Sequence, residues 1–382
     1  MMQDDQLSLG IRERFDWALF IALSLVAVIG IVNLYSATSV YSGARAEYYV
    51  SQVYWLVAGG ILAVFAASID YRHLERLGYV IYTIGIVCLI LVFVLGRDIR
   101  GSARWIVLGS FQFQPSEFMK LALIIALAKF LHDDPRGEGR TLRDLVVPAL
   151  MTATPVLLVL RQPDLGTGII MLLIFGTVAA LMRLRWKSLG ALFFLGGVLL
   201  PLAWSYVLKD YQRQRIISFL NPEADLRGAG WQAHNARVAI GNGGLFGQGY
   251  MRGTQNQFKF LPDQISDFPF PVFAEDWGFV GGVVLIGLYG FISIWSIRVA
   301  SQARDRFGAV MAVGVGAMIF WQAVINLGMV VGLLPVVGVT LPLFSSGGSS
   351  VMTVLIGLGL LMNVSMRRNY FAPVRRGDLL AP

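Results

Sequence analysis

Residues 257–278 read QFKFLPDQISDFPFPVFAEDWG and carry the chain from a long polar loop into a long apolar run. Asp267 stands where the loop gives way to that run. A carboxylate at the mouth of a membrane helix costs free energy unless it is partnered or hydrated, and such residues commonly serve function. Asp267 is therefore the first candidate for a functional residue, and we ask what the rest of the chain brings to it.

The composition is that of a polytopic membrane protein. Of the 382 residues, 56% are hydrophobic and only 14% are charged, whereas a soluble domain carries about a quarter charged residues. The net charge of +8 fits Arg and Lys in cytoplasmic loops better than a nucleic-acid partner, because these residues gather in the loops of one face. The single cysteine, Cys88, excludes an intrachain disulfide.

Apolar runs predict an all-α polytopic fold with about ten transmembrane helices. One large extracytoplasmic loop, 209–268, follows the seventh of them, and a single membrane domain spans 16–366 between cytoplasmic tails 1–15 and 367–382. Arg and Lys concentrate on the side that carries the termini, which makes that side cytoplasmic in a bacterial cytoplasmic membrane. The predicted helices are 16–36, 51–69, 77–96, 116–132, 144–161, 166–183, 187–208, 269–298, 307–331 and 348–366.

Charged residues at the outer end of the bundle are candidates for binding a substrate. In QPSEFMK, Glu117 and Lys120 share one helix face, and form either a structural ion pair or an inward cation that awaits a phosphate. In RQPDLGT, Asp164 either caps a helix or adds charge to this end. Arg104 adds a cation in the short loop before residue 116.

Two uncharged or glycine-rich segments also reach this end. The last external loop has prolines and glycines that forbid a continuous helix, so we interpret it as a re-entrant wall whose serines, Ser346 among them, could donate hydrogen bonds. In the large loop, Arg213 and Arg215 lie on an amphipathic segment. The run GNGGLFGQG (241–249), near Arg237, fits either a phosphate cradle or a tight turn that needs positive φ.

Several kinds of site are disfavoured by missing motifs. HExxH, CxxC and clustered histidines do not occur, which argues against zinc, and GxSxG does not occur, which argues against a Ser-His-Asp hydrolase. The sequence requires no cofactor. A divalent cation, Mg²⁺ or Mn²⁺, held jointly by a carboxylate and a substrate pyrophosphate stays an open alternative.

The motifs resemble those of the SEDS family, the shape, elongation, division and sporulation proteins, over roughly residues 100–366. In order along the chain they are FQPSEFMK, QPDLGT, DYQRQRI, FLNPEAD, AIGNGGLFGQG, FLPDQISDF, FAEDWG, NLGMVVGLLPVVGVTLPLFSSGGSS and GLLMNV. The DYQRQRI and FLNPEAD motifs are more similar to the elongation branch of the family than to its division branch. The resemblance implies a ten-helix peptidoglycan glycosyltransferase that polymerises lipid II, with a class B penicillin-binding protein as partner and Asp267 as the essential aspartate.

From this resemblance we hypothesise an inverting glycosyl transfer. Asp267 acts as general base for the acceptor hydroxyl, while Lys120, with Arg104, Arg213, Arg215 or a cation, neutralises the pyrophosphate. Pro269 and Pro271 predict a kinked helix entrance, and Glu275 and Asp276 are expected to be partnered rather than catalytic. The alternatives are a lipid II flippase, a scaffold that recruits the transpeptidase, and a septal polymerase of the division branch.

Overall fold

The computed structural model describes residues 15–43, 46–99, 102–108, 111–134, 141–182, 190, 197, 205, 210–221, 229–261 and 263–367. The predicted helix at 187–208 lies outside the described residues except for three isolated positions. The predicted tails, 1–15 and 367–382, also lie outside them except for Phe15 and Arg367.

Nine of the predicted apolar segments coincide with helices. Seven helices in the described part of the chain are long and apolar enough to cross a membrane; α5, with its charged residues, and the shorter α7 are not among them. The bounds are α2 (Trp17–Thr38), α3 (Tyr48–Ser68), α4 (Tyr71–Leu95), α5 (Pro115–Asp133), α6 (Leu142–Arg161), α7 (Leu165–Ala180), α12 (Pro269–Ser301), α13 (Arg306–Val331) and α14 (Gly348–Arg367).

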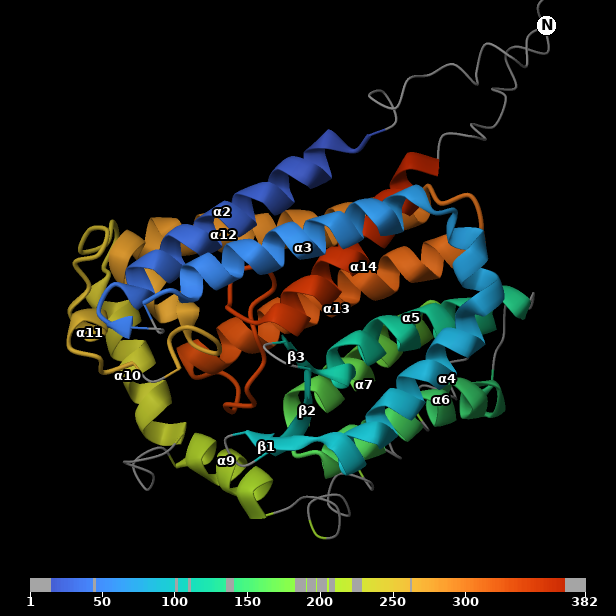
Figure 1. Ribbon diagram of the computed structural model, residues 1–382, viewed down its shortest axis with the longest axis horizontal. Coiled ribbons are helices and arrows are strands. Elements are labelled where there is room, and N and C mark those ends of the chain that lie inside the picture. The colour runs from blue at the N-terminus through green and yellow to red at the C-terminus, as the bar shows by residue number, and fades with distance from the viewer. Residues whose placement is uncertain are drawn as a thin grey trace, which may run out of the picture.

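Helices α13 and α14 form the centre of the bundle. Figure 1 shows them between α2, α3 and α12 on one side and α4, α5, α6 and α7 on the other. Most of α13 and α14 is buried, whereas α3 and α4 leave most of their apolar side chains uncovered. Uncovered apolar faces on outer helices suit contact with lipid, because lipid tails are as apolar as the side chains themselves.

Short elements collect at one end of the bundle (Figure 1). They include α9 (Asp210–Leu220), α10 (Ala229–Asn242) and α11 (Thr254–Gln257). Helix α10 ends at Asn242, within the start of the glycine-rich run 241–249. A three-stranded antiparallel sheet, β1 (Arg97–Ile99), β2 (Ser102–Leu108) and β3 (Phe111–Phe113), precedes α5 and was not predicted from the sequence.

Helix α12 is broken at Gly278, whose φ is 67° and ψ is −164°. The sequence predicted a kink at Pro269 and Pro271, and this is wrong. Pro269 lies in the first turn, where its missing N–H is not needed. The helix breaks at Gly278 because glycine adopts positive φ without a Cβ clash.

The glycine-rich turn, residues 243–249, provides hydrogen-bond partners for the main chain at the break in α12. A break leaves carbonyls before it and amides after it without helical partners. The amides of Gln248 and Gly249 donate to the oxygens of Glu275 and Asp276 (2.9 and 3.2 Å), and Phe279 donates back to Gly244 (2.9 Å). The turn therefore binds the main chain of α12, which supports the tight-turn interpretation over the phosphate cradle.

Replacing Gly247 with alanine is expected to destabilise the protein much more than replacing Gly244. Both glycines have positive φ, 85° and 52°, but a Cβ on Gly247 would lie 2.1 Å from the oxygen of Asp276, while one on Gly244 meets nothing within 4 Å. The additional clash should cost about 1–3 kcal/mol. Thermal melting of both variants in detergent measures the difference, and equal melting temperatures would contradict the assigned contact.

Glu275 and Asp276 are partnered, as predicted. Glu275 is fully buried. Its Oε1 accepts hydrogen bonds from the amide of Gln255 (3.0 Å) and the hydroxyl of Thr254 (3.2 Å). Asp276 Oδ2 accepts from the hydroxyl of Ser36 in α2 (2.5 Å). These two carboxylates tie the loop after α10 to the bundle and are engaged structurally.

Candidate active site

A cavity of about 490 Å³ lies at the end of the bundle where the short elements collect. We call it the central cavity. It is bounded by the sheet, by α5, α7 and α13, by the loop before α12 and by the irregular segment 332–347 before α14. Its polar lining includes Arg104, Gln112, Gln114, Glu117, Lys120, Asp164, Thr167, Arg215, Asp263, Ser266, Asp267, Gln322, Thr340, Ser346 and Ser350.

The irregular segment 332–347 forms the wall that the sequence predicted. The segment contains turns but no helix, so most of its buried carbonyls need other donors. Side chains from three helices provide them. The donors are Gln52 to the oxygen of Ser345 (3.1 Å), Tyr289 to that of Pro342 (2.7 Å) and Asn326 to that of Val339 (2.7 Å).

Asp267 is held by its main chain, which leaves its carboxylate directed at the cavity. Its amide donates to the oxygen of Asp263 (3.1 Å), and Asn326 Nδ2 of α13 donates to its oxygen (2.9 Å). Its Oδ2 lies only 3.3 Å from where a Cβ on Gly338 would sit. Gly338 therefore gives the carboxylate its room beside the irregular segment.

The Asp267 carboxyl is in an environment that favours its protonated form. Burial raises the pKa of Asp267 above its ordinary value, and the charge of Asp263 raises it further. The charges of Arg104 and Arg215, together with a hydrogen bond from Ser266, act in the opposite direction. A carboxylate with a raised pKa beside cations is a stronger base than an exposed aspartate, which suits proton abstraction.

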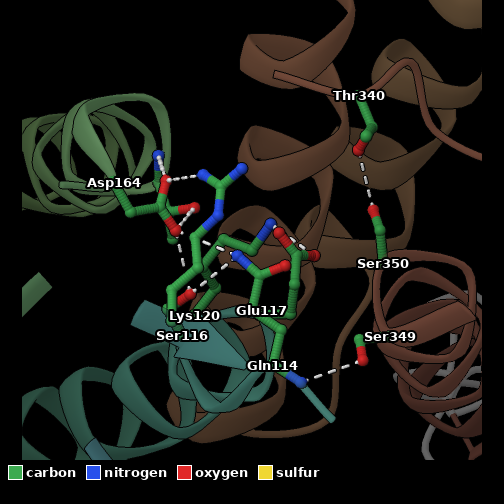
Figure 2. Close-up of polar contacts among 10 residues, drawn as sticks. Gln114, Ser116, Glu117, Lys120, Asp164, Thr340, Ser349 and Ser350 are labelled. Atoms are coloured by element: carbon green, nitrogen blue, oxygen red, sulfur yellow. Dashed lines mark hydrogen bonds and ion pairs between the residues drawn. The ribbon is translucent and has the colours of Figure 1, made fainter. Parts of the chain in front are cut away.

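Asp164 is the centre of a polar cluster between α5 and α7 (Figure 2). It caps α7, one of the two roles that the sequence left open, because its Oδ1 accepts from the amide of Thr167 (3.3 Å). Its Oδ2 accepts from Ser116 and from Gln114, each at 3.0 Å, and its Oδ1 lies 3.6 Å from Arg104. These contacts fix Arg104 at the rim of the cavity.

Glu117 and Lys120 form the ion pair that their spacing predicted. Lys120 Nζ lies 2.9 Å from Glu117 Oε2, and the Lys120 side chain is 1% exposed. Figure 2 shows the pair beside the Asp164 cluster. A buried ammonium group has three N–H donors, and Glu117 is the one partner that the described residues give it. Lys120 therefore offers further donors to a ligand in the cavity.

The three arginines predicted in the large loop separate in space. Arg215 lines the central cavity and donates to the oxygen of Val336 (3.1 Å). Arg213 turns toward Asp210 (3.5 Å) and the oxygen of Ser205 (2.9 Å), and does not line the cavity. Arg237 packs against Gly332 beside a smaller cavity of about 60 Å³. The structure thus brings only Arg215 of this group to Asp267.

The serines after residue 344 differ in what they contact. Ser346 lines the central cavity and its amide donates to the oxygen of Ile265 (2.9 Å), which anchors the irregular segment to the loop before α12. Ser350 faces the cavity with Thr340, at 2.8 Å from its hydroxyl (Figure 2). Ser349 is engaged with the main chain of Gln114 (3.0 Å).

Several cavity residues were missed by sequence reasoning, Gln114 and Gln322 among them. Gln114 precedes α5 and Gln322 lies within α13. Neither side chain is charged, so neither stood out beside the charged residues of the candidate site. A polar residue in a membrane helix is itself the signal that could have found Gln322, since such residues are costly and face the interior of a bundle. The described residues contain no group of three or more His, Cys, Asp or Glu side chains placed to hold a metal ion.

The chain is similar to known proteins over most of its length. The chain matches the family model of the cell cycle proteins FtsW, RodA and SpoVE over residues 16–370. It is 35% identical to the peptidoglycan glycosyltransferase MrdB of Escherichia coli K12, over 90% of this chain and 93% of that protein.

Two solved structures are similar throughout. A chain from a peptidoglycan synthase complex that coordinates polymerization and crosslinking is 35% identical, with a TM-score of 0.79 over 93% of this chain and 99% of that one. The rod shape determining protein RodA of Thermus thermophilus is 33% identical, with a TM-score of 0.69 over 93% and 98% of the two chains.

Proposed function

The chain belongs to the FtsW, RodA and SpoVE family of cell cycle proteins, and from this membership and its cavity we infer that it is a peptidoglycan glycosyltransferase that polymerises lipid II. The observation that carries the inference is the placement of Asp267 in one cavity with Lys120, Arg104 and Arg215. A base and a group of cations are the two requirements for joining a sugar hydroxyl to a sugar that bears a pyrophosphate.

We propose a single displacement at the anomeric carbon of the donor sugar. Asp267 accepts the proton of the acceptor 4-hydroxyl as its oxygen forms the new C–O bond. The bond to the lipid pyrophosphate breaks, and its electron pair leaves with the phosphate oxygen. Lys120, Arg104 and Arg215 stabilise that developing charge, and such stabilisation is largest where the cation is buried, as Lys120 is. One displacement inverts the configuration at the anomeric carbon.

The acid limb of the rate profile should respond to the charges around Asp267. The base must be deprotonated, so the rate falls as pH drops through its pKa. Asp263 raises that pKa and Arg215 lowers it. Asp263→Asn is therefore expected to move the acid limb to lower pH and Arg215→Met to move it to higher pH. Initial rates across pH measure both; shifts of the same sign would contradict the assignment of the base.

A divalent cation stays a proposal beside this mechanism. Asp263 and Asp267 both line the cavity, and carboxylate oxygens together with a pyrophosphate suit Mg²⁺ or Mn²⁺. Such an ion would supply additional charge neutralisation at the leaving group. Adding and then chelating the metal during polymerisation by the purified protein tests the requirement, and a rate that is indifferent to both would remove the ion from the proposal.

We propose a class B penicillin-binding protein as the partner of this membrane protein. The similar chain in a synthase complex that combines polymerization with crosslinking supports a transpeptidase partner. The orientation proposed is that of a bacterial cytoplasmic membrane with both termini inside and the cavity outside. Cysteine labelling at Asn242, the exposed last residue of α10, tests it, since an impermeant reagent should reach that position from outside.

The decisive experiment uses labelled lipid II in detergent with the purified protein and its partner. We expect the protein to make polymer. Detergent contains no membrane across which lipid II could be moved, and a protein that acted only as a flippase would make no polymer. A scaffold makes none either, even with its partner present. If the protein is folded and its transpeptidase partner is active, but no polymer forms, the transferase assignment is wrong.

A role in elongation rather than division is part of the proposal. It is supported by the similarity to a rod shape determining protein and by the motifs of the large loop. Depleting the protein from its cells should convert rods into spheres. Long filaments without septa would place it in the division branch instead.

A further inference from the structure

Gln322 is a buried amide that the proposed mechanism does not use. It lies within α13 and is 1% exposed, and it lines the central cavity. Its Oε1 has no hydrogen-bond partner among the described residues. A buried polar atom left without a partner costs about 1–3 kcal/mol, so such a group is expected to meet a ligand or a water molecule.

The position of Gln322 places it close to the reacting groups. Asn326, one helical turn further along α13, donates to the main-chain oxygen of Asp267. Gln322 therefore lies about 6 Å along the helix axis from the residue that anchors the base. Next to it, Trp321 Nε1 donates to Thr177 of α7 (3.0 Å), which fixes α13 against α7.

Other residues that line the central cavity define the chemistry that it offers to a ligand bound at Gln322. Lys120 of α5 has N–H donors beyond the one that Glu117 takes, and Ile170 of α7 is an apolar residue that is 1% exposed. Gln322 offers an acceptor oxygen and an NH2 group with two N–H donors, whichever way its carboxamide is turned. A ligand group that fits has an N–H, a carbonyl oxygen and a small apolar end.

A phosphate fits less well here than a secondary amide. It would satisfy Lys120, but it has no donor for the Gln322 oxygen. An acetamido group supplies an N–H for Gln322, a carbonyl oxygen for the remaining donors and a methyl group for Ile170. The sugars of peptidoglycan carry such a group on the carbon next to the anomeric carbon.

We propose that Gln322 and Ile170 form the subsite for the N-acetyl group of the donor sugar, with Gln322 accepting the hydrogen bond of its N–H and Ile170 contacting its methyl. The inference rests on the proposed function and specifies the same cavity further. It makes Gln322 a specificity residue: it holds the carbon next to the anomeric centre and so orients that centre toward the acceptor hydroxyl.

The hydrogen bond is tested with lipid II analogues changed at the muramic sugar. An O-acetyl analogue has nearly the same shape and lacks only the N–H. Wild type is expected to polymerise it about tenfold more slowly than the N-acetyl substrate. Gln322→Met should slow the N-acetyl substrate to the rate of the O-acetyl one and so abolish the preference. Because each comparison is made within one variant, partial unfolding cancels.

The methyl contact is tested with an N-propionyl analogue. Wild type should use it at least about tenfold less well than the N-acetyl substrate, because the extra carbon meets Ile170. Ile170→Ala should remove that penalty. Ile174→Ala is the matched control: it removes the same atoms one turn away on α7, from a residue that is buried and does not line the cavity, and it should retain the wild-type preference.

The possible failures are distinguishable. If wild type makes no polymer from native lipid II, the proposed function fails. If wild type polymerises native lipid II but Gln322→Met keeps the wild-type preference for N-acetyl, or Ile170→Ala discriminates as Ile174→Ala does, the subsite is overturned while the function stands.

Discussion

Replacing Asp267 with asparagine is expected to lower the rate of lipid II polymerisation by about 10²–10⁴, the usual contribution of a general base. Asparagine keeps the shape of the side chain and leaves the main-chain hydrogen bonds with Asp263 and Asn326 in place. The substitution removes the negative charge of the carboxylate and its ability to accept the proton. Folding should therefore be nearly unchanged, and the loss should appear in the turnover rate measured with saturating substrate.

The matched control is Asp210→Asn, in α9 of the same large loop. The Asp210 side chain is fully exposed and does not line the central cavity. This variant should polymerise lipid II at the wild-type rate. If Asp267→Asn were as active as Asp210→Asn while both melted at the wild-type temperature, Asp267 would not be the base.

Replacing Lys120 with methionine is expected to affect both stability and activity. It leaves the Glu117 carboxylate buried without its cation, which costs about 3–5 kcal/mol when a buried pair is broken. It also removes a charge that stabilises the leaving pyrophosphate, a loss of about 10²–10³ in rate for a comparable group. Melting in detergent and initial polymerisation rates measure the two effects separately.

A double variant separates the two interpretations that the sequence left open. Lys120→Met with Glu117→Gln removes both charges, so most of the lost stability should return. If the pair is merely structural, polymerisation returns with it. If Lys120 contacts the substrate, the protein is stable and still slow, and this is the outcome that we expect.

The sequence predicted the helices because each is a long apolar run, and membrane thickness fixes how long such a run must be. The starts of α5 and α12 are marked locally by Pro115 and Pro269, and the cap of α7 by Asp164. The grouping of Asp267 with Lys120 and Arg104 followed from placing each of them at the outer end of the bundle.

What the sequence did not reveal depends on contacts between distant segments. Of the strands before α5, β1 and β3 have only three residues each, and the seven-residue β2 (SARWIVL) loses its alternation of polar and apolar residues after Trp105. The role of Gly247 depends on a carbonyl of Asp276, in another part of the chain, and no local pattern encodes that partner. Arg215 and Arg237 lie on neighbouring helices, and the sequence does not distinguish between them. Arg215 lines the central cavity because α9 packs against the irregular segment.

The glycine-rich turn also has a consequence for reading substitution data. Its contacts with α12 are made by main-chain atoms, so Gly243 and Gly247 should tolerate no replacement, whereas the exposed side chains of Leu245 and Phe246 between them should tolerate many. A saturation mutagenesis library of this turn would therefore show positions that tolerate substitution between positions that do not. That profile resembles a ligand-binding loop, although it marks a joint between two parts of one polypeptide.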